Sequence, residues 1–434
     1  MPRAGVGLAV AVIASLAVAG AASAKTFTVN DRSDHNPGKC NAADCTLREA
    51  VIAANKRDGS DRITLPATKP YRLTRGPQDP DARYGDLDVR DRLRIVHVGA
   101  GLAKIRSQVE DRVIESTAQL LVDKLVVRDG AVFGPGGGVM AHHDLEVKRS
   151  RVVANHALRG GGIAVRDPVE DPADLTVRRS TVASNLASGG PGGGIDFTGA
   201  NLRVVTSTIA RNEATCPSIC LVVDPQEGGG LRIDAGGGRI RSSTISGNRA
   251  FDNGGGIWNG ADAMGIVNTT IADNSTFDSG GGIYAAPDSG ADANAVTIAR
   301  NRADANDQDA DNGGGIFADG GSDVINLANS LVVLNRTTGG VLQDCDAPAP
   351  VGVTTDGGNL ISTSTDCPFF DDPEDVEDSA PMVRQLADNG GPTETAALRA
   401  GSPAIGEADG FGPPDTDQRG VARDADPDIG AYER

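Results

Sequence analysis

The sequence predicts an all-β fold, a single-stranded right-handed parallel β-helix with a helical cap at its N-terminus. Three observations predict it: a short phrase that recurs along the chain, a nearly constant spacing inside each repeat, and alternating apolar and polar residues in the constant part. Periods of this size are typical of stacked repeats, in which each repeat packs only against its neighbours.

Each repeat contains an aliphatic run, a Ser/Thr-Ile/Val pair, an Asn, and then three glycines followed by Val, Ile or Leu. The triplets open at Gly136, Gly160, Gly192, Gly228, Gly254, Gly280 and Gly313. The Asn residues are Asn155, Asn185, Asn212, Asn248, Asn274, Asn301 and Asn335. We expect these Asn residues to form a structural ladder, each at a corner, tolerating a left-handed backbone and bonding the amides of neighbouring coils. A glycan-binding face is the alternative role.

The two parts of the repeat differ in how much their length varies. From the hydrophobe after a triplet to the next Asn the interval is 16 to 22 residues, whereas 4 to 15 residues separate an Asn from the following triplet. Stacked strands need a constant length, whereas doubling the length of a surface loop costs only ~0.6 kcal/mol. We therefore expect every insertion to leave the stack at the same corner.

The constant part is predicted to be strand rather than helix. Residues 202–204 and 207–209, for example, alternate with period two and are rich in β-branched side chains. Glycine triplets would destabilise a helix by roughly 1 kcal/mol per residue. Strands this short must pair in parallel with the same strand of the next repeat, about 4.8 Å away. An aromatic content of 3% fits a narrow aliphatic interior.

Residues 1–24 are predicted to be an export signal. Arg3 provides the basic start, residues 5–20 the apolar stretch, and residues 22–24 a cleavage site of the A-x-A type. A membrane anchor is the alternative, and no later segment is long and apolar enough to span a bilayer. The mature chain is expected to be secreted or associated with the cell surface. The full sequence has a formal charge of −18, and removal of Arg3 makes the mature chain one unit more negative, which argues against nucleic acid and anionic membranes as partners.

Six cysteines fit the oxidising environment of an exported chain. Fifteen pairings are possible, and we favour the three local ones. The predicted disulfides are Cys40–Cys45, Cys216–Cys220 and Cys345–Cys367. A zinc site is the alternative, but the sequence has neither a C-x2-C pair nor a histidine cluster near these cysteines.

Residues 25–65 are predicted to form a cap over the first coil. Thr46 and Glu49 make a capping box at the start of an amphipathic helix, which would cover edges that otherwise promote aggregation. The helix begins with the run Cys45-Thr46-Leu47-Arg48-Glu49-Ala50. This run resembles the bacterial CSLREA domain, with Thr46 where that family usually has Ser. The resemblance implies an exported β-helix protein without an assigned activity.

Residues 66–345 are assigned to the repeats and residues 346–434 to a C-terminal module that we expect to continue the coil. The module contains four motifs, at residues 388–393, 401–405, 417–420 and 428–433. In this order they are similar to the choice-of-anchor domain (Q type) of bacterial secreted β-helix proteins, although Gly406 stands where that family more often has Asp or Asn. The resemblance implies the pectin-lyase-like superfamily. The sequence ends at Arg434 without an anchoring tail, which implies release or attachment by other means.

The acidic loop 304–312 is the strongest local signal for a metal. Its alternating oxygen ligands could surround Ca²⁺, which takes six to eight of them, but it lacks the glycine and the terminal Glu of an EF-hand. The candidate ligands are Asp304, Asn306, Asp307, Asp309 and Asp311. A solvated acidic loop is the alternative. No other cofactor is indicated.

No catalytic constellation stands out. Glycoside cleavage needs two carboxylates about 5–10 Å apart, and the sequence singles out no pair. His142 and His143 are adjacent, so on a strand they would point to opposite faces. Trp258 and Tyr284 follow triplets directly and could serve a sugar groove, but we expect both to pack at core corners.

Two hypotheses follow. The first is a non-catalytic protein that binds or adheres through loops on one face, with a polysaccharide or another cell-surface component as its partner. The alternative is a polysaccharide lyase or glycoside hydrolase of the pectin-lyase-like fold. The sequence does not indicate the oligomeric state.

Overall fold

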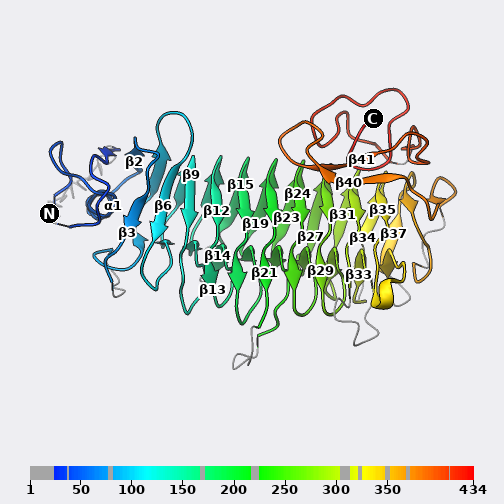
Figure 1. The fold of residues 1–434 in the computed structure, drawn as a ribbon, viewed down its shortest axis with the longest axis horizontal. Helices are drawn as coiled ribbons and strands as arrows, with labels where there is room; N and C mark the ends of the chain where they lie inside the picture. Colours follow the sequence, from blue (N-terminus) through cyan, green and yellow to red (C-terminus); the bar gives the residue numbers. More distant parts are fainter. Residues whose placement is uncertain are drawn as a thin grey trace, which may run out of the picture.

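The computed structural model describes residues 24–36, 39–76, 82–166, 172–216, 224–303, 313–320, 325–347, 352–367, 372–409 and 411–434. Within them the chain winds into one elongated right-handed parallel β-helix, as is usual for parallel crossover connections. The helix α1 lies at one end, and the C-terminal segment lies against the side of the other end (Figure 1). The predicted fold class is confirmed.

The described strands of the coil form four parallel sheets, which we name A to D. Sheet A contains β1 (Thr26–Thr28), β2 (Asp61–Leu65), β5 (Leu93–His97), β8 (Leu120–Asp123), β11 (Leu145–Lys148), β15 (Asp174–Arg178), β19 (Asn201–Val205), β23 (Gly237–Arg241), β27 (Ala263–Val267), β31 (Ala291–Asn294), β34 (Ile325–Ala328) and β37 (Val353–Thr355). Sheet B contains β3 (Tyr71–Leu73), β6 (Ala103–Ser107), β9 (Leu125–Arg128), β12 (Arg151–Val153), β16 (Thr181–Ala183), β20 (Thr208–Ala210), β24 (Thr244–Ser246), β28 (Thr270–Ala272), β32 (Thr297–Ala299), β35 (Leu331–Val333), β38 (Leu360–Ile361) and β39 (Val376–Glu377).

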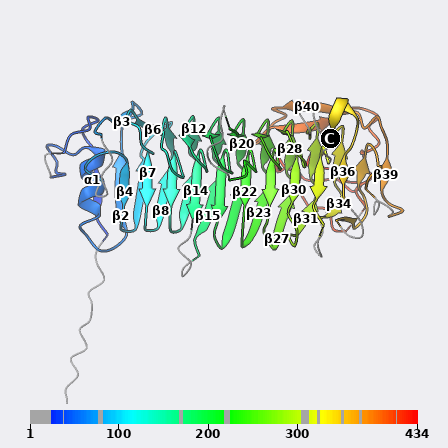
Figure 2. The ribbon, with the colours of Figure 1, turned by 90° about the horizontal axis from the view of Figure 1, so that it is seen from below.

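Sheets C and D complete each coil. Sheet C contains β4 (Leu87–Val89), β7 (Ile114–Ser116), β10 (Val139–Ala141), β14 (Ile163–Arg166), β18 (Ile195–Thr198), β22 (Leu231–Ile233), β26 (Ile257–Asn259), β30 (Ile283–Ala285), β33 (Ile316–Ala318) and β36 (Cys345–Asp346). Sheet D contains β13 (His156–Ala157), β17 (Leu186–Ala187), β21 (Glu213–Ala214), β25 (Arg249–Ala250) and β29 (Ser275–Thr276). A 3₁₀ turn, η1, spans Thr338–Gly340. Figure 2 shows strands of sheets A and C lying across the long axis, one after another along the stack.

The interior is an unbroken aliphatic column. Equivalent residues of successive coils pair directly, so that Ile245 lies beside Ile271, and Ile271 beside Ile298. All three are fully buried in a core that extends from the cap to the last coils. Each such side chain contributes about 1.5–3 kcal/mol.

The Asn residues of the repeat form a continuous ladder inside the wall. The backbone N–H and side-chain Nδ2 of Asn248 donate to Oδ1 of Asn274, at 3.0 and 2.9 Å. Its Nδ2 also donates to the carbonyl oxygen of Ile209 at 3.0 Å. The same pattern runs from Asn155 to Asn335, and all seven residues are at most 2% exposed. Asn335 donates its two N–H groups to Oδ1 of Asp344, where the ladder ends.

The left-handed corner residue is not the Asn itself. The residue before each ladder Asn has a positive φ, and these residues are Ala154, Ser184, Arg211, Gly247, Asp273, Arg300 and Leu334. The expectation that the Asn takes the left-handed conformation is therefore wrong. The sharp bend one residue earlier directs the Asn side chain into the wall, where its amide satisfies backbone groups of both neighbouring coils.

A second ladder of hydroxyl groups lies at the corner between sheets A and B. The backbone N–H of Ser150 donates to Oγ of Ser180, that of Ser180 to Ser207, and that of Ser207 to Ser243, each at 3.1 Å. We did not predict this ladder, although each of these residues stands five positions before a ladder Asn.

The glycine triplets lie where backbones of successive coils approach most closely. A Cβ on Gly255 would meet the carbonyl oxygens of Gly281 and Ser275 at 2.5 Å. We expect Gly255→Ala to lower the free energy of unfolding by about 3 kcal/mol, the upper range for overpacking, because backbone atoms cannot rotate away. Thermal unfolding measures this effect. In Gly265→Ala, a matched control, the new Cβ would have only Arg239 Nε nearby, at 3.9 Å, so a melting temperature close to wild type is expected.

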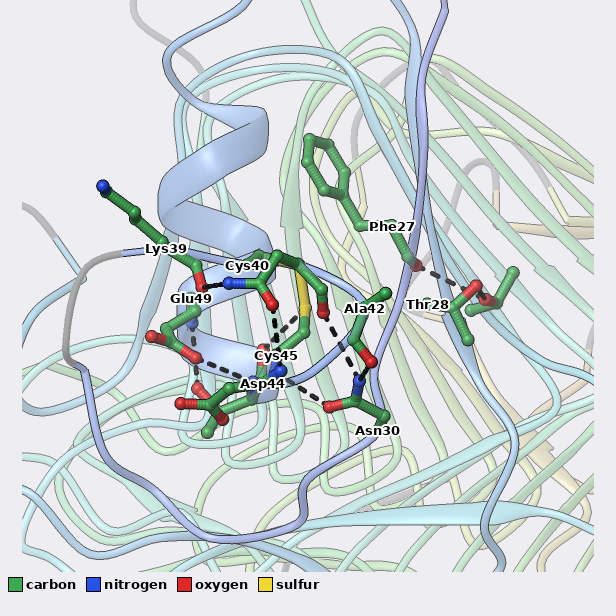
Figure 3. The surroundings of a disulfide bond; sticks show 12 residues. Phe27, Thr28, Asn30, Lys39, Cys40, Ala42, Asp44, Cys45 and Glu49 are labelled. Atoms are coloured by element: carbon green, nitrogen blue, oxygen red, sulfur yellow. Dashed lines mark hydrogen bonds between the residues drawn. A yellow bond between two sulfur atoms is a disulfide. The ribbon is translucent and has the colours of Figure 1, made fainter.

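The cap covers the first coil with α1 (Leu47–Ala54). Thr46 Oγ1 accepts from Glu49 N at 3.2 Å, and Glu49 Oε2 accepts from Thr46 N at 3.0 Å, which completes the capping box. The disulfide Cys40–Cys45 closes the loop that enters the helix (Figure 3). Asn30 Oδ1 accepts a hydrogen bond from the backbone N–H of Cys45 at 2.8 Å, which joins this loop to the segment after β1.

The C-terminal segment first extends the coil through β37, β38 and β39. It then folds back and lies along the outer face of sheet B, with the antiparallel pair β40 (Val383–Ala387) and β41 (Thr395–Leu398) (Figure 1). Gln418 accepts from Thr270 Oγ1 at 2.7 Å and donates to Thr244 Oγ1 at 3.0 Å. Ala431 N donates to Thr297 Oγ1 at 3.0 Å. Thr393 Oγ1 donates to the carbonyl oxygen of Ser242 at 3.4 Å, so three of the four C-terminal motifs contribute hydrogen bonds that hold this segment against the coil.

The number of residues that connect sheet C to each neighbouring sheet varies from coil to coil. Between sheets D and C, residues 215–230 join β21 to β22, whereas residues 251–256 join β25 to β26. Between sheets C and A, residues 167–173 join β14 to β15, whereas residues 199–200 join β18 to β19. The prediction that every insertion leaves at one corner is therefore wrong. Both turns around the short strands of sheet C tolerate extra residues, because the strands on either side keep their register.

Candidate functional site

One row of side chains runs along the outer face of sheet C, and we call it the sheet C row. It consists of the second residue of each strand, namely Asp88, Glu115, Met140, Ala164, Asp196, Arg232, Trp258, Tyr284, Phe317 and Asp346. Their strand neighbours, such as Ile257 and Ile283, point into the core. The expectation that Trp258 and Tyr284 pack at core corners is wrong, because each occupies the middle of a strand and faces outward.

Three aromatic rings of this row stack on one another. The ring centroids of Trp258 and Tyr284 are 6.4 Å apart at an interplanar angle of 11°, and those of Tyr284 and Phe317 are 5.5 Å apart at 17°. The guanidinium of Arg232 lies 4.8 Å from the centroid of the Trp258 ring. The ring faces therefore cover each other, and Tyr284 is buried between Trp258 and Phe317, which are partly exposed. The Tyr284 hydroxyl donates to Asp319 at the rim.

An ion-pair cluster continues the row beyond Arg232. The fully buried Asp196 accepts from Arg159 Nε at 2.7 Å and lies 3.5 Å from Arg232 Nη1. Arg232 also lies 3.5 Å from Glu227 and donates to Asp234 at 2.8 Å. Arg159 Nη1 also lies 3.6 Å from Asp224, so two guanidinium groups face four carboxylates and the cluster is net acidic.

Several polar atoms of this cluster lack hydrogen bonds within the described part of the chain. They are Asp196 Oδ1, Arg232 Nε, Arg232 Nη1 and Trp258 Nε1, all shielded from water. Buried polar groups in folded proteins nearly always have a hydrogen-bond partner, so each exception needs a physical explanation, such as bound water, an ion or a ligand. Asp196 Oδ1 and Arg232 Nη1 are 3.5 Å apart, which is an ion-pair distance but not a full hydrogen bond. These atoms come from three successive coils.

Burial sets the protonation of the groups beside the row. Burial raises the pKa of Glu227; the charge of Arg232 opposes this rise and that of Asp252 adds to it. Burial, together with the hydrogen bond to Asp319, raises the pKa of Tyr284, so its phenol remains a donor. Burial disfavours the charge of Arg159, but Asp196 outweighs this effect and raises the pKa of Arg159. The row therefore combines donors, acceptors and an apolar stripe.

The sequence-predicted sites lie elsewhere. The Asn ladder is sealed in the wall and is not accessible to a glycan. Disulfides join Cys40 to Cys45 and Cys345 to Cys367, as predicted. Cys220, the predicted partner of Cys216, lies outside the described residues. The candidate calcium ligands Asp304, Asn306, Asp307, Asp309 and Asp311 of the acidic loop also lie outside them, as do residues 1–23 of the predicted export signal.

Sequence reasoning missed most of the sheet C row. The sequence contained a pattern that could have identified the row. The residue immediately after the hydrophobe that follows a glycine triplet is, in five successive repeats, Asp196, Arg232, Trp258, Tyr284 and Phe317. Aligning the repeats at the triplets would have placed these side chains in one line. The ion pair between Arg159 and Asp196 carries no comparable signal, since Arg159 belongs to a connection of variable length.

Comparisons with known proteins bear on the architecture. No protein-family model matches the sequence, and no curated protein matches it either. Among solved structures the chain is similar to one described as the crystal structure of pectate lyase Pel9A. The likeness covers 96% of this chain and 98% of that chain, with 14% identity and a TM-score of 0.45. The likenesses of residues 45–50 and 388–433 to CSLREA and choice-of-anchor domains remain predictions.

Proposed function

We propose that this protein binds an extended, uncharged polysaccharide along the sheet C row without cleaving it. The observation that carries the proposal is the line formed by Asp196, Arg232, Trp258, Tyr284 and Phe317 on five successive coils. Coils repeat about every 4.8 Å, a distance comparable to one sugar unit of an extended chain. A polymer lying parallel to the axis would therefore meet equivalent positions repeatedly.

The charges beside the row favour a neutral ligand. Glu227, Asp234 and Asp319 flank it together with buried Asp196, whereas Arg159 and Arg232 are the positive groups in these ion pairs. The whole chain carries a formal charge of −18. A polyuronate would be repelled, whereas hydroxyl groups can bond to carboxylates, guanidinium and phenol alike. Because the aromatic faces are covered by one another, recognition rests on ring edges and polar groups.

Export is part of this proposal. The disulfides Cys40–Cys45 and Cys345–Cys367 support folding in an oxidising compartment, where polysaccharides of cell surfaces are encountered. Within the described residues, no helix has the length and apolar character needed to cross a bilayer.

Intrinsic fluorescence offers a direct test, because Trp258 is the only tryptophan of the chain. We expect neutral oligosaccharides of the glucan, xylan or mannan series to change its emission, with affinity rising with chain length. Arg232→Gln should weaken binding about tenfold, equivalent to ~1.4 kcal/mol, because it removes the charged donor over the indole. Phe411→Ala is the matched control, since Phe411 is 76% exposed on the C-terminal segment.

Three outcomes would contradict the proposal. They are unchanged emission across the neutral series, tighter binding of polygalacturonate than of neutral chains, and equal losses in Arg232→Gln and Phe411→Ala. Melting temperatures of both variants, measured in parallel, separate lost binding from lost folding.

A second candidate function is glycoside hydrolysis. Burial raises the pKa of Glu227, so this carboxyl is suited to proton donation, and a second carboxyl, Asp234, pairs with the same Arg232 at 2.8 Å. Glycosidases use carboxyl pairs of this kind. Release of reducing ends by wild type but not by Glu227→Gln, with binding retained, would favour hydrolysis over binding alone.

A further inference from the structure

A second cluster of polar side chains lies at the N-terminal end of the sheet C row. Asp86 immediately precedes β4, Asp88 lies on β4, and Glu115 lies on the neighbouring strand β7. One carboxylate oxygen of each lies within 4.8 Å of the other two. This cluster belongs to the first coils, whereas the proposed polysaccharide contacts begin at Asp196 on β18.

The cluster contains more negative than positive charge. Arg112 Nη1 lies 3.5 Å from Asp86 Oδ2 and also pairs with Glu115 Oε2. His142 Nε2 lies 3.2 Å from Glu115 Oε1. Asp111 adds a fourth carboxylate, whose Oδ2 accepts the backbone N–H of Asp86 at 3.1 Å. One guanidinium and one imidazole thus face four carboxylates.

Asp86 is the residue of this cluster whose buried carboxylate lacks hydrogen-bond donors among the described residues. Its side chain is 1% exposed, and neither carboxylate oxygen accepts a hydrogen bond from any described residue. Asp88 Oδ2, in contrast, accepts from Ala82 N at 2.7 Å. An ionised carboxylate removed from water without donors is strongly destabilising, so such groups are normally paired or coordinate a metal. The 3.5 Å ion pair with Arg112 leaves Asp86 Oδ1 without a partner.

The geometry points to a divalent-cation site, for Ca²⁺ in preference to other ions, formed by Asp86, Asp88 and Glu115. Ca²⁺ binds carboxylate oxygens at roughly 2.3–2.6 Å in flexible arrangements, so two ligands of one ion lie at most about 5 Å apart. The 4.8 Å limit among the three oxygens meets this condition. Mg²⁺ demands a stricter octahedral shell, and Zn²⁺ prefers nitrogen and sulfur ligands.

The ion would join the cap to the coil. The carbonyl oxygens of Ala82 and Asp86 both accept from Arg48 on α1, at 2.9 Å, so the segment that carries Asp86 is already fixed to the cap. Glu115 belongs to the next coil. A cation between Asp86 and Glu115 would therefore link α1 to two coils at the end of the stack, where a solenoid is most prone to fraying.

The test compares the full-length protein in EGTA and in millimolar Ca²⁺, using Ca²⁺ itself as the probe. We expect Ca²⁺ to raise the melting temperature of the wild type saturably and to give a binding heat by calorimetry. In Asp86→Asn, both responses should be lost. Without Ca²⁺, Asp86→Asn should melt no lower than the wild type, since no described residue donates a hydrogen bond to the Asp86 carboxylate and the substitution reduces the excess of carboxylates in the cluster; this result also shows that the variant folds.

A control separates this site from the acidic loop 304–312. The double variant Asp307→Asn/Asp309→Asn should keep the Ca²⁺-dependent rise in melting temperature. Glu115→Gln, which alters the proposed ligand on β7, should reduce the Ca²⁺-dependent rise in melting temperature. The inference is overturned if the wild type shows no Ca²⁺-dependent shift, if Asp86→Asn retains the wild-type shift, or if the loop variant abolishes it.

Discussion

Asn274→Asp is expected to lower the free energy of unfolding by about 3–5 kcal/mol, although it only replaces a side-chain NH₂ by oxygen. Nδ2 of Asn274 donates to the carbonyl oxygen of Ile245 at 3.0 Å and to Oδ1 of Asn301 at 2.9 Å. In the variant, a buried carboxylate oxygen would face both acceptors with no proton between them. The other oxygen would still accept from Asn248, as Oδ1 does in the wild type. Urea unfolding followed by Trp258 fluorescence measures the loss.

The pH dependence of this variant gives an independent check. A protonated carboxyl group regains one donor, so the destabilisation should be smaller at pH 4.5 than at pH 7.5. The sign follows from linkage: a group whose pKa is raised by folding contributes stability that is lost as pH rises. A deficit that grows on acidification would contradict this account.

Asp344→Asn, at the end of the same ladder, is the matched comparison. Asp344 Oδ2 accepts the backbone N–H groups of Ser362 and Thr363 at 2.7 and 3.2 Å, while Oδ1 accepts from Asn335. An amide here would place an NH₂ group against two N–H groups. A loss of about 1–3 kcal/mol is expected, because a buried donor left unsatisfied costs that amount. Asn274→Asp and Asp344→Asn are opposite substitutions, and both are expected to lower the free energy of unfolding. If either variant were as stable as the wild type, the ladder would not discriminate an amide from a carboxylate.

Arg48→Met is expected to destabilise the cap by about 3–5 kcal/mol. Arg48 is completely buried, and its Nε and Nη2 donate to Asp34 at 2.6 and 3.1 Å. It also donates to the carbonyl oxygens of Ala82, Gly85 and Asp86 at 2.8–2.9 Å. Met fills the volume but leaves buried acceptors without donors. Arg48→Lys should recover only part of the loss, because a single ammonium cannot reproduce the planar fork.

Hydrogen exchange should localise the effect of Arg48→Met. Protection should fall first in α1 and the first coils and remain near wild type around the Asn ladder, because each coil contacts only its neighbours. Arg57→Met is the control: Arg57 belongs to the same cap, but its side chain is 41% exposed and pairs with Asp61 at 3.7 Å, so a change below about 1 kcal/mol is expected. Equal effects of the two variants would contradict a special role for Arg48.

The candidate site shows the limit of sequence reasoning. The glycine triplets and Asn residues predicted how the chain coils, and Trp258 and Tyr284 were noticed because they follow triplets. Their outward orientation and their stacking with Phe317 were not predicted. The alternation within a strand of three residues is too short to identify the outer face with certainty, and the stack exists only once coils 26 to 33 residues apart are aligned.

The repeat pattern predicts the coil, because aliphatic residues at fixed intervals must share one interior and the one Asn at the same corner of each coil must meet the Asn of the next coil. The sequence also indicated the local disulfides, since short loops bring Cys40 close to Cys45. The positions of Asp86 beside Glu115 and of Arg159 beside Asp196 follow from the folded coil and not from the repeat pattern. The tertiary structure alone showed that the last residues return to sheet B through Gln418. Such contacts depend on how many residues each coil contains and on where its loops turn, and neither is expressed in the local pattern of apolar and polar residues.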